Sequence, residues 1–391
     1  MSLNVFGRWL LLFDLLLPIA VLLFLLPVYP GISSIPVVLW VVIQLLMAPR
    51  RQRWAAWPMV FILLLYSRSW WLHEMPHPAA PQDGVLFVSA LFAGATVTEQ
   101  RWARLLRLLL LPLIPLIFQL GSTPLLTDPL VREGRPWTPN YLAGTNQGAY
   151  VLGLLFLIAF AWLLKEAQPP YQKLIAAASS ALAAVMVWQT GSRAALVTAL
   201  VAIALIWIKE RAHKGKVLRD VMLLVSLGAT MLLVKQMVRP SSFGFPGIDV
   251  SSDSGRLAIA RCYAAIPFSG NNRFLWGVGF DRPEHFCRDP VHGGVAEHAH
   301  NLYLQLFANT GSLGLLGLGL VFILILIAWR RTNPLLDPLV CRGGQFSLVY
   351  CSIQGLLDVS VLHWPLTLVV SGLLVAIPLA VTCPVVPSRE M

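Results

Sequence analysis

The chain has 391 residues, of which 57% are hydrophobic and 12% charged, and its formal net charge at pH 7 is +11. Because a large share of any folded surface faces water, a soluble domain of this length has nowhere to hide so much apolar surface. The basic residues stand in short clusters between apolar runs and form no stripe interleaved with aromatics, so we expect no nucleic-acid partner. The apolar runs are unbroken rather than alternating, which predicts an all-α polytopic membrane protein.

About twelve apolar spans follow one another along the chain, and the fourth and eighth are the shortest. The first span has no small-residue cleavage site, so we interpret it as a retained helix rather than a signal peptide. We expect the spans at 9–28, 33–49, 54–72, 84–98, 103–121, 143–164, 171–189, 193–208, 217–237, 300–329, 343–360 and 364–383. Twelve crossings return both termini to the same side of the membrane.

The charges of the short connections orient these spans. One set of alternate connections carries the lysines and arginines, and it comprises 50–53, 101–107, 165–173, 209–219 and 330–342. The opposite set begins with 73–83, which contains neither lysine nor arginine. By the positive-inside rule the first set is cytoplasmic, both termini lie inside, and the second set faces outward.

Two outward connections are longer than a turn, at 122–142 and 238–299. We therefore divide the chain into 1–237 with spans one to nine, the large outer loop 238–299, and 300–391 with the last three spans. Both loops carry arginines against the charge rule. Long loops cross regardless of charge, so solvated loops explain this, but an anionic substrate would need such a cationic outer pocket.

The strongest local pattern opens the tenth span, where residues 297–301 read EHAHN and Gly311 and Gly314 follow. A helix beginning near His300 would put that histidine at the outer membrane boundary. Gly311, Gly314 and Gly317 would make a groove that another helix can approach. The plain alternative is a pair of loop histidines beside a packing helix. The nearby acids form no recognisable ligand motif, so we expect no metal.

Further polar patterns recur at the same outer depth. They are residues 189–193 (QTGSR), 253–256 (DSGR) before an apolar stretch at 257–267 that we expect to be a surface helix, 134–146, Asp358 and 363–365. Snorkelling explains an arginine such as Arg193, and ordinary turn chemistry explains the others. Their convergence on one side nevertheless indicates a site.

Cysteine positions suggest one disulfide. Cys262 and Cys287 both fall in the large outer loop, whereas the other three cysteines lie in or next to membrane spans. An oxidising compartment would permit Cys262 and Cys287 to pair.

Taken in order, these motifs resemble the O-antigen ligase and O-antigen polymerase superfamily. The resemblance rests on Gly191-Ser192-Arg193, on 254–256 with 275–279 after it, and on His300-Asn301 followed after nine residues by Gly311 and Gly314. It covers roughly residues 130–315, and the ligase is the favoured member.

The resemblance implies a glycosyltransferase that is metal-independent, inverting and without a cofactor. Its donor would be a polyprenyl-diphosphate-linked glycan and its acceptor a sugar hydroxyl of lipid A–core, at the periplasmic face of the bacterial inner membrane. Arg193 and Arg256 match the arginines that hold the diphosphate, and His300 matches the essential histidine. Arg135 and Asn146 match the family's first-loop region loosely.

Two histidines are candidates for the general base of the reaction. His298 is a second candidate, and the following Asn301 favours His300; Glu297 could orient the imidazole. We therefore class Arg135, Asn146, Glu297, His298 and Asn301 as candidate substrate-binding residues. The chemistry is coherent, because guanidinium groups stabilise a diphosphate leaving group and a neutral hydroxyl needs a base of histidine's pKa.

Two other functions compete with the ligase. A polymerase would use the same donor but a second lipid-linked repeat unit as acceptor. A transporter or lipid flippase would place ionisable residues near the bilayer midplane, where Asp14 is the clearest candidate. The sequence leaves the glycan, the acceptor sugar and the oligomeric state open.

Overall fold

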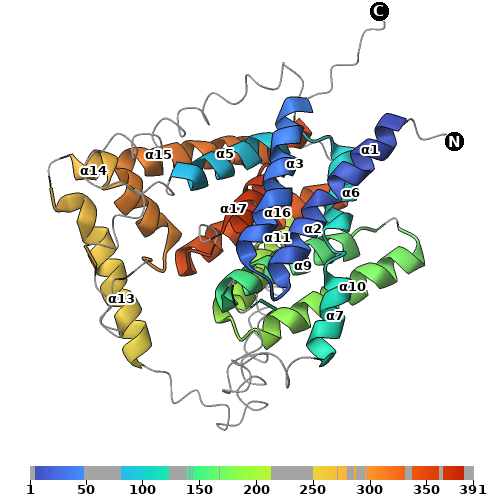
Figure 1. The fold of residues 1–391 in the computed structure, drawn as a ribbon, viewed down its shortest axis with the longest axis horizontal. Coiled ribbons are helices and arrows are strands. Elements are labelled where there is room, and N and C mark those ends of the chain that lie inside the picture. The colour runs from blue at the N-terminus through green and yellow to red at the C-terminus, as the bar shows by residue number, and fades with distance from the viewer. Residues whose placement is uncertain are drawn as a thin grey trace, which may run out of the picture.

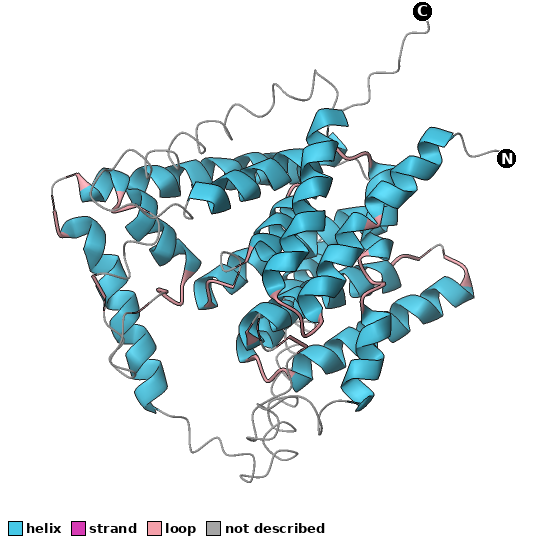
Figure 2. Cartoon of the chain, viewed as in Figure 1, coloured by secondary structure: helices cyan, strands magenta, loops and turns pink. Residues whose placement is uncertain are grey.

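The computed structural model describes residues 5–47, 81–122, 139–140, 142, 144–166, 168–212, 250–270, 272–279, 286–287, 296, 298–330, 337–360 and 364–382. All regular secondary structure in these residues is helical, as Figure 2 shows. The expected spans at 54–72 and 217–237 lie outside the described residues. Each of the other expected spans contains a helix, so the all-α prediction is confirmed.

The elements follow one another as labelled in Figure 1. In chain order they are α1 (Val5–Asp14), α2 (Leu16–Leu25), η1 (Pro30–Ser33), α3 (Ser34–Met47), α5 (Pro81–Ala95), α6 (Glu99–Leu108), α7 (Leu113–Ser122), α9 (Thr145–Leu163), α10 (Pro170–Gln189), α11 (Arg193–Ala212), α13 (Val250–Ala265), η3 (Ile266–Phe268), α14 (Arg273–Trp276), α15 (Leu302–Arg330), α16 (Pro338–Leu357), α17 (Pro365–Val375) and α18 (Ile377–Thr382).

Five helical stretches among the described residues are long and apolar enough to cross a membrane. They are Pro30–Met47, Glu99–Gln119, Thr145–Leu163, Pro170–Gln189 and Leu302–Trp329. Shorter apolar helices cover Leu12–Leu25, Val85–Ala95, Ala194–Ile208 and Pro365–Val375. These lengths support a polytopic membrane protein; a total of twelve crossings stays a prediction.

Connections of the basic set meet at one end of the bundle. The ammonium of Lys165, after α9, lies 2.8 Å from a carboxylate oxygen of Asp337, which precedes α16. The backbone N–H of Asp337 donates to Glu99 at the start of α6, and the Arg342 guanidinium donates to the carbonyl of Leu164 at 2.6 Å. Connections that the sequence assigns to the same side therefore lie side by side.

Connections of the other set meet at the opposite end of α16. The fully buried Asn140 donates through its amide to the carbonyls of Phe24 and Val28, at 2.8 and 2.9 Å, and so satisfies one carbonyl in the last turn of α2 and one just beyond it. The rings of Tyr29 and Trp364 meet edge to face at 6.2 Å between centroids. Among the connections that the structure describes, those that the sequence assigns to one side thus lie together, while the assignment of one side to the cytoplasm stays a prediction.

Small residues let the central helices approach closely. A Cβ added to Gly94 of α5 would lie 2.8 Å from the Leu373 carbonyl oxygen, and one added to Gly372 of α17 would lie 2.8 Å from that of Phe87. Backbone contact of this kind is how helices pack where lipid supplies no hydrophobic driving force.

A buried ionic network joins α1, α3 and α6. The Asp14 carboxylate, fully buried, accepts from Arg101 at 2.6 Å and from Arg104 at 2.6 Å. Arg101 also donates to the Gln44 side-chain oxygen at 2.6 Å, and its guanidinium lies over the rings of Phe13 and Trp40. Asp14, the clearest residue in favour of a transporter, is therefore neutralised by two arginines of the basic set.

Candidate functional site

The 189–193 motif is a sharp turn between two helices. Gly191 has φ +68°, a left-handed conformation that suits glycine and ends α10. The Ser192 hydroxyl accepts from the backbone N–H of Ala195 at 3.5 Å, as an N-terminal cap of α11 does. The same hydroxyl donates to the Asn146 side-chain oxygen at 3.3 Å. The turn that starts with Gly191 and the first turn of α9 are therefore neighbours, which brings two sequence-predicted regions together.

The histidine segment, residues 298–301, leads directly into the first turn of α15. Asn301 caps this helix, because its side-chain oxygen accepts from the N–H groups of Tyr303 and Leu304, each at 3.0 Å. Its amide donates to the Leu356 carbonyl at 3.0 Å, at the end of α16. His300 has φ +51°, an uncommon backbone conformation for a residue other than glycine. The predicted helix start near His300 is correct to two residues.

Gln305, one turn into α15, holds the same segment from the other side. Its side-chain oxygen accepts from the N–H of Ala299 at 2.9 Å, and both residues are buried. His298 and His300 flank Ala299 and are partly exposed. The backbone between the two histidines is thus held at Ala299.

The glycine pattern in α15 makes a kink where a second backbone docks. Gly311 has φ +65° and ψ −165°, values that in practice only glycine adopts. Gly277, which follows α14, has φ +69° and ψ −165°. The backbone N–H groups of Val278 and Gly279 donate to the carbonyls of Ala308 and Asn309, both at 2.9 Å.

A Cβ added at Gly311 or at Gly277 would meet backbone atoms of the other segment, at 2.4 Å in each case. The sequence prediction of close approach at Gly311 is thus right, but its partner is the 275–279 segment rather than a neighbouring membrane helix. The space beside Gly314 is occupied instead by Thr310 of its own helix.

Helix α13 belongs to the same assembly. Its residues Ile259 and Tyr263 form a small core, separate from the main one, with buried residues of the outer loop and α15. The expected helix at 257–267 is confirmed, with bounds Val250–Ala265. Arg256 lies exposed on it, about two turns before Tyr263. Cys262 of α13 and Cys287 form a disulfide with a Cα–Cα separation of 5.9 Å.

Three predicted residues fall wholly or partly outside the described part of the chain. Arg135 and Glu297 lie outside the described residues, and of Arg193 only the backbone, at the start of α11, belongs to them. Asp358 is buried beyond α16 and accepts from the Ser360 hydroxyl and the Val359 N–H. Across the described part of the chain, no cluster of three or more histidine, cysteine or acidic residues stands ready to hold a metal ion.

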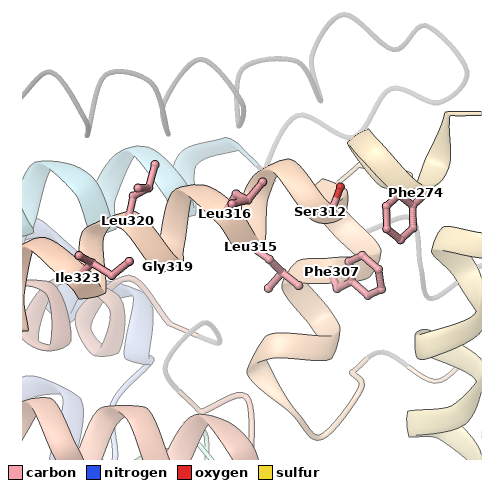
Figure 3. Close-up of a pocket in the computed structure, with 8 residues that line it drawn as sticks. All are labelled: Phe274, Phe307, Ser312, Leu315, Leu316, Gly319, Leu320 and Ile323. Carbon is pink, nitrogen blue, oxygen red and sulfur yellow. The ribbon is translucent and has the colours of Figure 1, made fainter.

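An apolar groove of about 450 Å³ runs along α15 from the kink (Figure 3). It is lined by Phe274, Phe307, Ser312, Leu315, Leu316, Gly319, Leu320 and Ile323. Phe268 joins Phe274 and Phe307 in an aromatic cluster with centroids 5.5 to 6.0 Å apart. The lining suits lipid chains, and the two histidines are not part of it.

Sequence reasoning missed Tyr263 and Gln305. Both act on backbone groups of another segment: the Tyr263 hydroxyl donates to the Ala296 carbonyl at 2.7 Å, and Gln305 accepts from Ala299. The one available signal was a glutamine early in a strongly apolar span, since a polar residue there usually has a partner.

A family model described as O-antigen ligase matches residues 178–319. This part of the chain is similar to the O-antigen ligase family. The resemblance drawn from the motifs is confirmed at the level of the superfamily, and the matched segment runs from α10 past the α15 kink. It therefore includes the Gly191 turn, α13, the 275–279 segment and both histidines. No curated protein matches the chain.

Proposed function

We propose that the protein is a glycosyltransferase of the O-antigen ligase type. Its donor is a polyprenyl-diphosphate-linked glycan and its acceptor a sugar hydroxyl of lipid A–core, at the periplasmic face of the bacterial inner membrane. The observation that carries the proposal is that segments of the matched domain fold onto one another around the histidines. The 275–279 segment docks on the α15 kink, and the histidine segment docks on α13 and α15.

In the proposed reaction the acceptor oxygen attacks the anomeric carbon of the donor sugar. The bond from that carbon to the diphosphate oxygen breaks, and the polyprenyl diphosphate leaves with the electron pair. Displacement from the opposite side inverts the anomeric centre. The acceptor's proton passes to the His300 imidazole, which acts as the general base.

The leaving group develops negative charge that needs stabilisation rather than a proton. Arg193 and Arg256 supply guanidinium groups that bind phosphate oxygens bidentately. Such preorganised cations act most strongly where water is excluded. With these arginines in place the reaction needs neither a metal ion nor a cofactor. Arg135, Asn146, Glu297, His298 and Asn301 remain the candidates for substrate contacts, with the Asn301 side chain already engaged as a helix cap.

The experiment uses purified protein in detergent with a polyprenyl-diphosphate-linked glycan, in EDTA, with and without rough lipopolysaccharide. A glycan ladder transferred to the lipopolysaccharide by the wild type, and absent with His300→Ala, supports a metal-independent ligase. Elongation of the lipid-linked glycan without that acceptor identifies a polymerase, the second candidate, which the same donor chemistry favours. If folded wild-type protein forms neither product, the enzyme assignment is wrong.

A further inference from the structure

Two adjacent residues of α13 reach the segment that leads to the histidines. Cys262 is joined to Cys287 by the disulfide. Tyr263 donates its hydroxyl hydrogen to the Ala296 carbonyl at 2.7 Å. The N–H of Ala296 donates to the Cys287 carbonyl at 2.9 Å. Both backbone groups of Ala296 are therefore bonded to α13, one directly and one through the disulfide partner.

These contacts are shielded from water. Tyr263 is fully buried, Cys287 is 1% exposed and Ala296 is 4% exposed. A hydrogen bond in such surroundings is expensive to lose, because the group left behind has no water to replace its partner. The attachment of Ala296 to α13 is consequently a rigid one.

The histidines follow two and four residues after Ala296. On their far side Gln305 holds Ala299 and Asn301 caps α15. Ala296 is thus fixed to α13, and Ala299 and Asn301 are fixed to α15. Helix α13 also carries Arg256, so the same attachment sets where the histidines stand relative to that arginine.

We propose that Tyr263 and the Cys262–Cys287 disulfide are positioning groups that hold the histidine segment in its working place relative to α13. The assignment of chemistry to the histidines rests on the proposed function, but the positioning itself does not. A displacement of about 1 Å at a reacting group can cost a hundredfold in rate. The attachment is therefore expected to govern turnover more than donor binding.

The first test replaces Tyr263 by phenylalanine, which keeps the buried ring and removes only the hydroxyl. We expect kcat to fall by about tenfold to a hundredfold with the KM for the donor within about twofold. Tyr350→Phe is the matched control, because it removes another buried tyrosine hydroxyl that donates to a carbonyl, that of Tyr150 at 3.3 Å. Equal kcat in Tyr263→Phe and Tyr350→Phe would overturn the proposal.

The second test opens the disulfide. Dithiothreitol reduces Cys262 and Cys287 to thiols and is itself oxidised to a cyclic disulfide. We expect kcat of the wild type to drop at least fivefold, and a variant with the other three cysteines replaced by serine to drop equally. A Cys262→Ser/Cys287→Ser variant should have low kcat and no response to the reductant. A wild type whose kcat survives confirmed reduction would contradict a positioning role for the disulfide.

Hydrogen exchange separates this inference from the proposed function, since it needs no substrate. The amides of Ala296 and Ala299 are bonded in the wild type, so a peptide covering 296–301 should exchange slowly. Tyr263→Phe and reduction should each speed its exchange, and Tyr350→Phe should not. Faster exchange in Tyr263→Phe, combined with a wild type that transfers no glycan, would refute the proposed function alone. Unchanged exchange in Tyr263→Phe would refute the positioning alone.

Discussion

His300 stands between two fixed points of the backbone. Ala299 before it is bonded to Gln305, and Asn301 after it caps α15 and bonds to the end of α16. A left-handed backbone at His300 costs on the order of 1 kcal/mol and persists only where its surroundings impose it. Such a conformation aims a side chain that a relaxed loop would not aim, which suits a general base.

The first prediction separates the two histidines. Loss of a general base costs about 10²- to 10⁴-fold in rate, so His300→Ala should lower kcat by at least a hundredfold. His298→Ala, the matched control two residues away, should keep kcat within about fivefold. Glycan transfer measured by gel at saturating donor checks both variants. The reverse order of losses would assign the base to His298.

The second prediction concerns the pH dependence of the wild type. A general base must be neutral to accept a proton, so activity should rise with pH as the imidazole loses its proton. The rate of transfer measured between pH 5 and 8 should therefore show an acidic limb. The residual activity of His300→Ala should lack it. An identical limb in that variant would show that another group titrates.

The third prediction tests Arg256 as a ligand of the diphosphate. Arg256→Ala should lower kcat/KM by more than tenfold, and Arg256→Lys should recover only part, because lysine keeps the charge but loses the bidentate geometry. The residue is exposed, so the melting temperature should not change. Arg261→Ala is the control, since Arg261 is an exposed arginine of the same helix. Equal losses in both alanine variants would indicate a general charge effect instead.

The sequence did not indicate which groups the side chains at this site contact. Asn301 was expected to bind substrate, yet its side chain is used on both ends by backbone groups of α15 and α16. Tyr263 and Gln305 escaped notice because their partners are carbonyl and amide groups of Ala296 and Ala299. The amino-acid sequence does not show which backbone group a side chain will contact in the folded protein.

At the scale of elements, the kink in α15 joins the outer loop to the membrane helix. A straight helix of 29 residues would measure about 43 Å, well beyond the hydrocarbon thickness of a bilayer. The break at Gly311 changes the direction of the helix. It leaves the carbonyls of Ala308 and Asn309 free to accept from the N–H groups of Val278 and Gly279. The kink in α15 therefore helps to set the position of the histidines.

The fourth prediction concerns the glycines at this contact. Gly311→Ala and Gly277→Ala each put a Cβ on a backbone conformation reserved for glycine and against the facing chain, so each should destabilise the fold by about 2 kcal/mol or more. Gly319→Ala is the control, since its Cβ would meet open space and alanine favours helix by up to about 1 kcal/mol. Thermal unfolding in detergent should rank Gly319→Ala at or above the wild type and the other two below it.

Hydropathy predicted the helices but not their interruptions. The expected span at 103–121 is divided between α6 and α7, and α15 changes direction within an unbroken apolar run. Both features depend on backbone dihedral angles, to which average hydropathy is insensitive. Spaced glycines signalled close approach correctly at Gly311, but the partner came from a loop whose docking no periodicity reveals.

For the whole molecule, the alternation of charge predicted the two ends of the bundle. The connections after α9 and before α16 bond to each other and to the start of α6, as one basic set should. What charge alone could not predict is that arginines counted as loop residues enter the bundle. Arg101 is 8% exposed and paired with Asp14 from a different helix. The buried pair lies at the end of the bundle away from the histidines.

The fifth prediction tests whether this pair stabilises the fold. Asp14→Asn leaves the Arg101 charge buried without its counterion, and breaking a buried ion pair in this way costs about 3–5 kcal/mol. Lys165→Met breaks the half-buried pair with Asp337 and should cost only about 0–1 kcal/mol. Thermal unfolding should therefore show a large drop for the first variant and a small one for the second.

The same variants decide what Asp14 does for function. If Asp14 serves only to hold α1, α3 and α6 together, the folded fraction of Asp14→Asn should transfer glycan with kcat within about twofold of the wild type. A direct role of Asp14 in the reaction would instead make that variant inactive while still folded. Replacing Asp14 and Arg101 together by apolar residues should then restore stability, because the desolvation of both charges is removed along with their attraction. Turnover should be measured on the stabilised double variant below its melting temperature, so that unfolding does not affect the result. Full activity would show that the network serves the fold, and loss of activity would show that it serves the reaction.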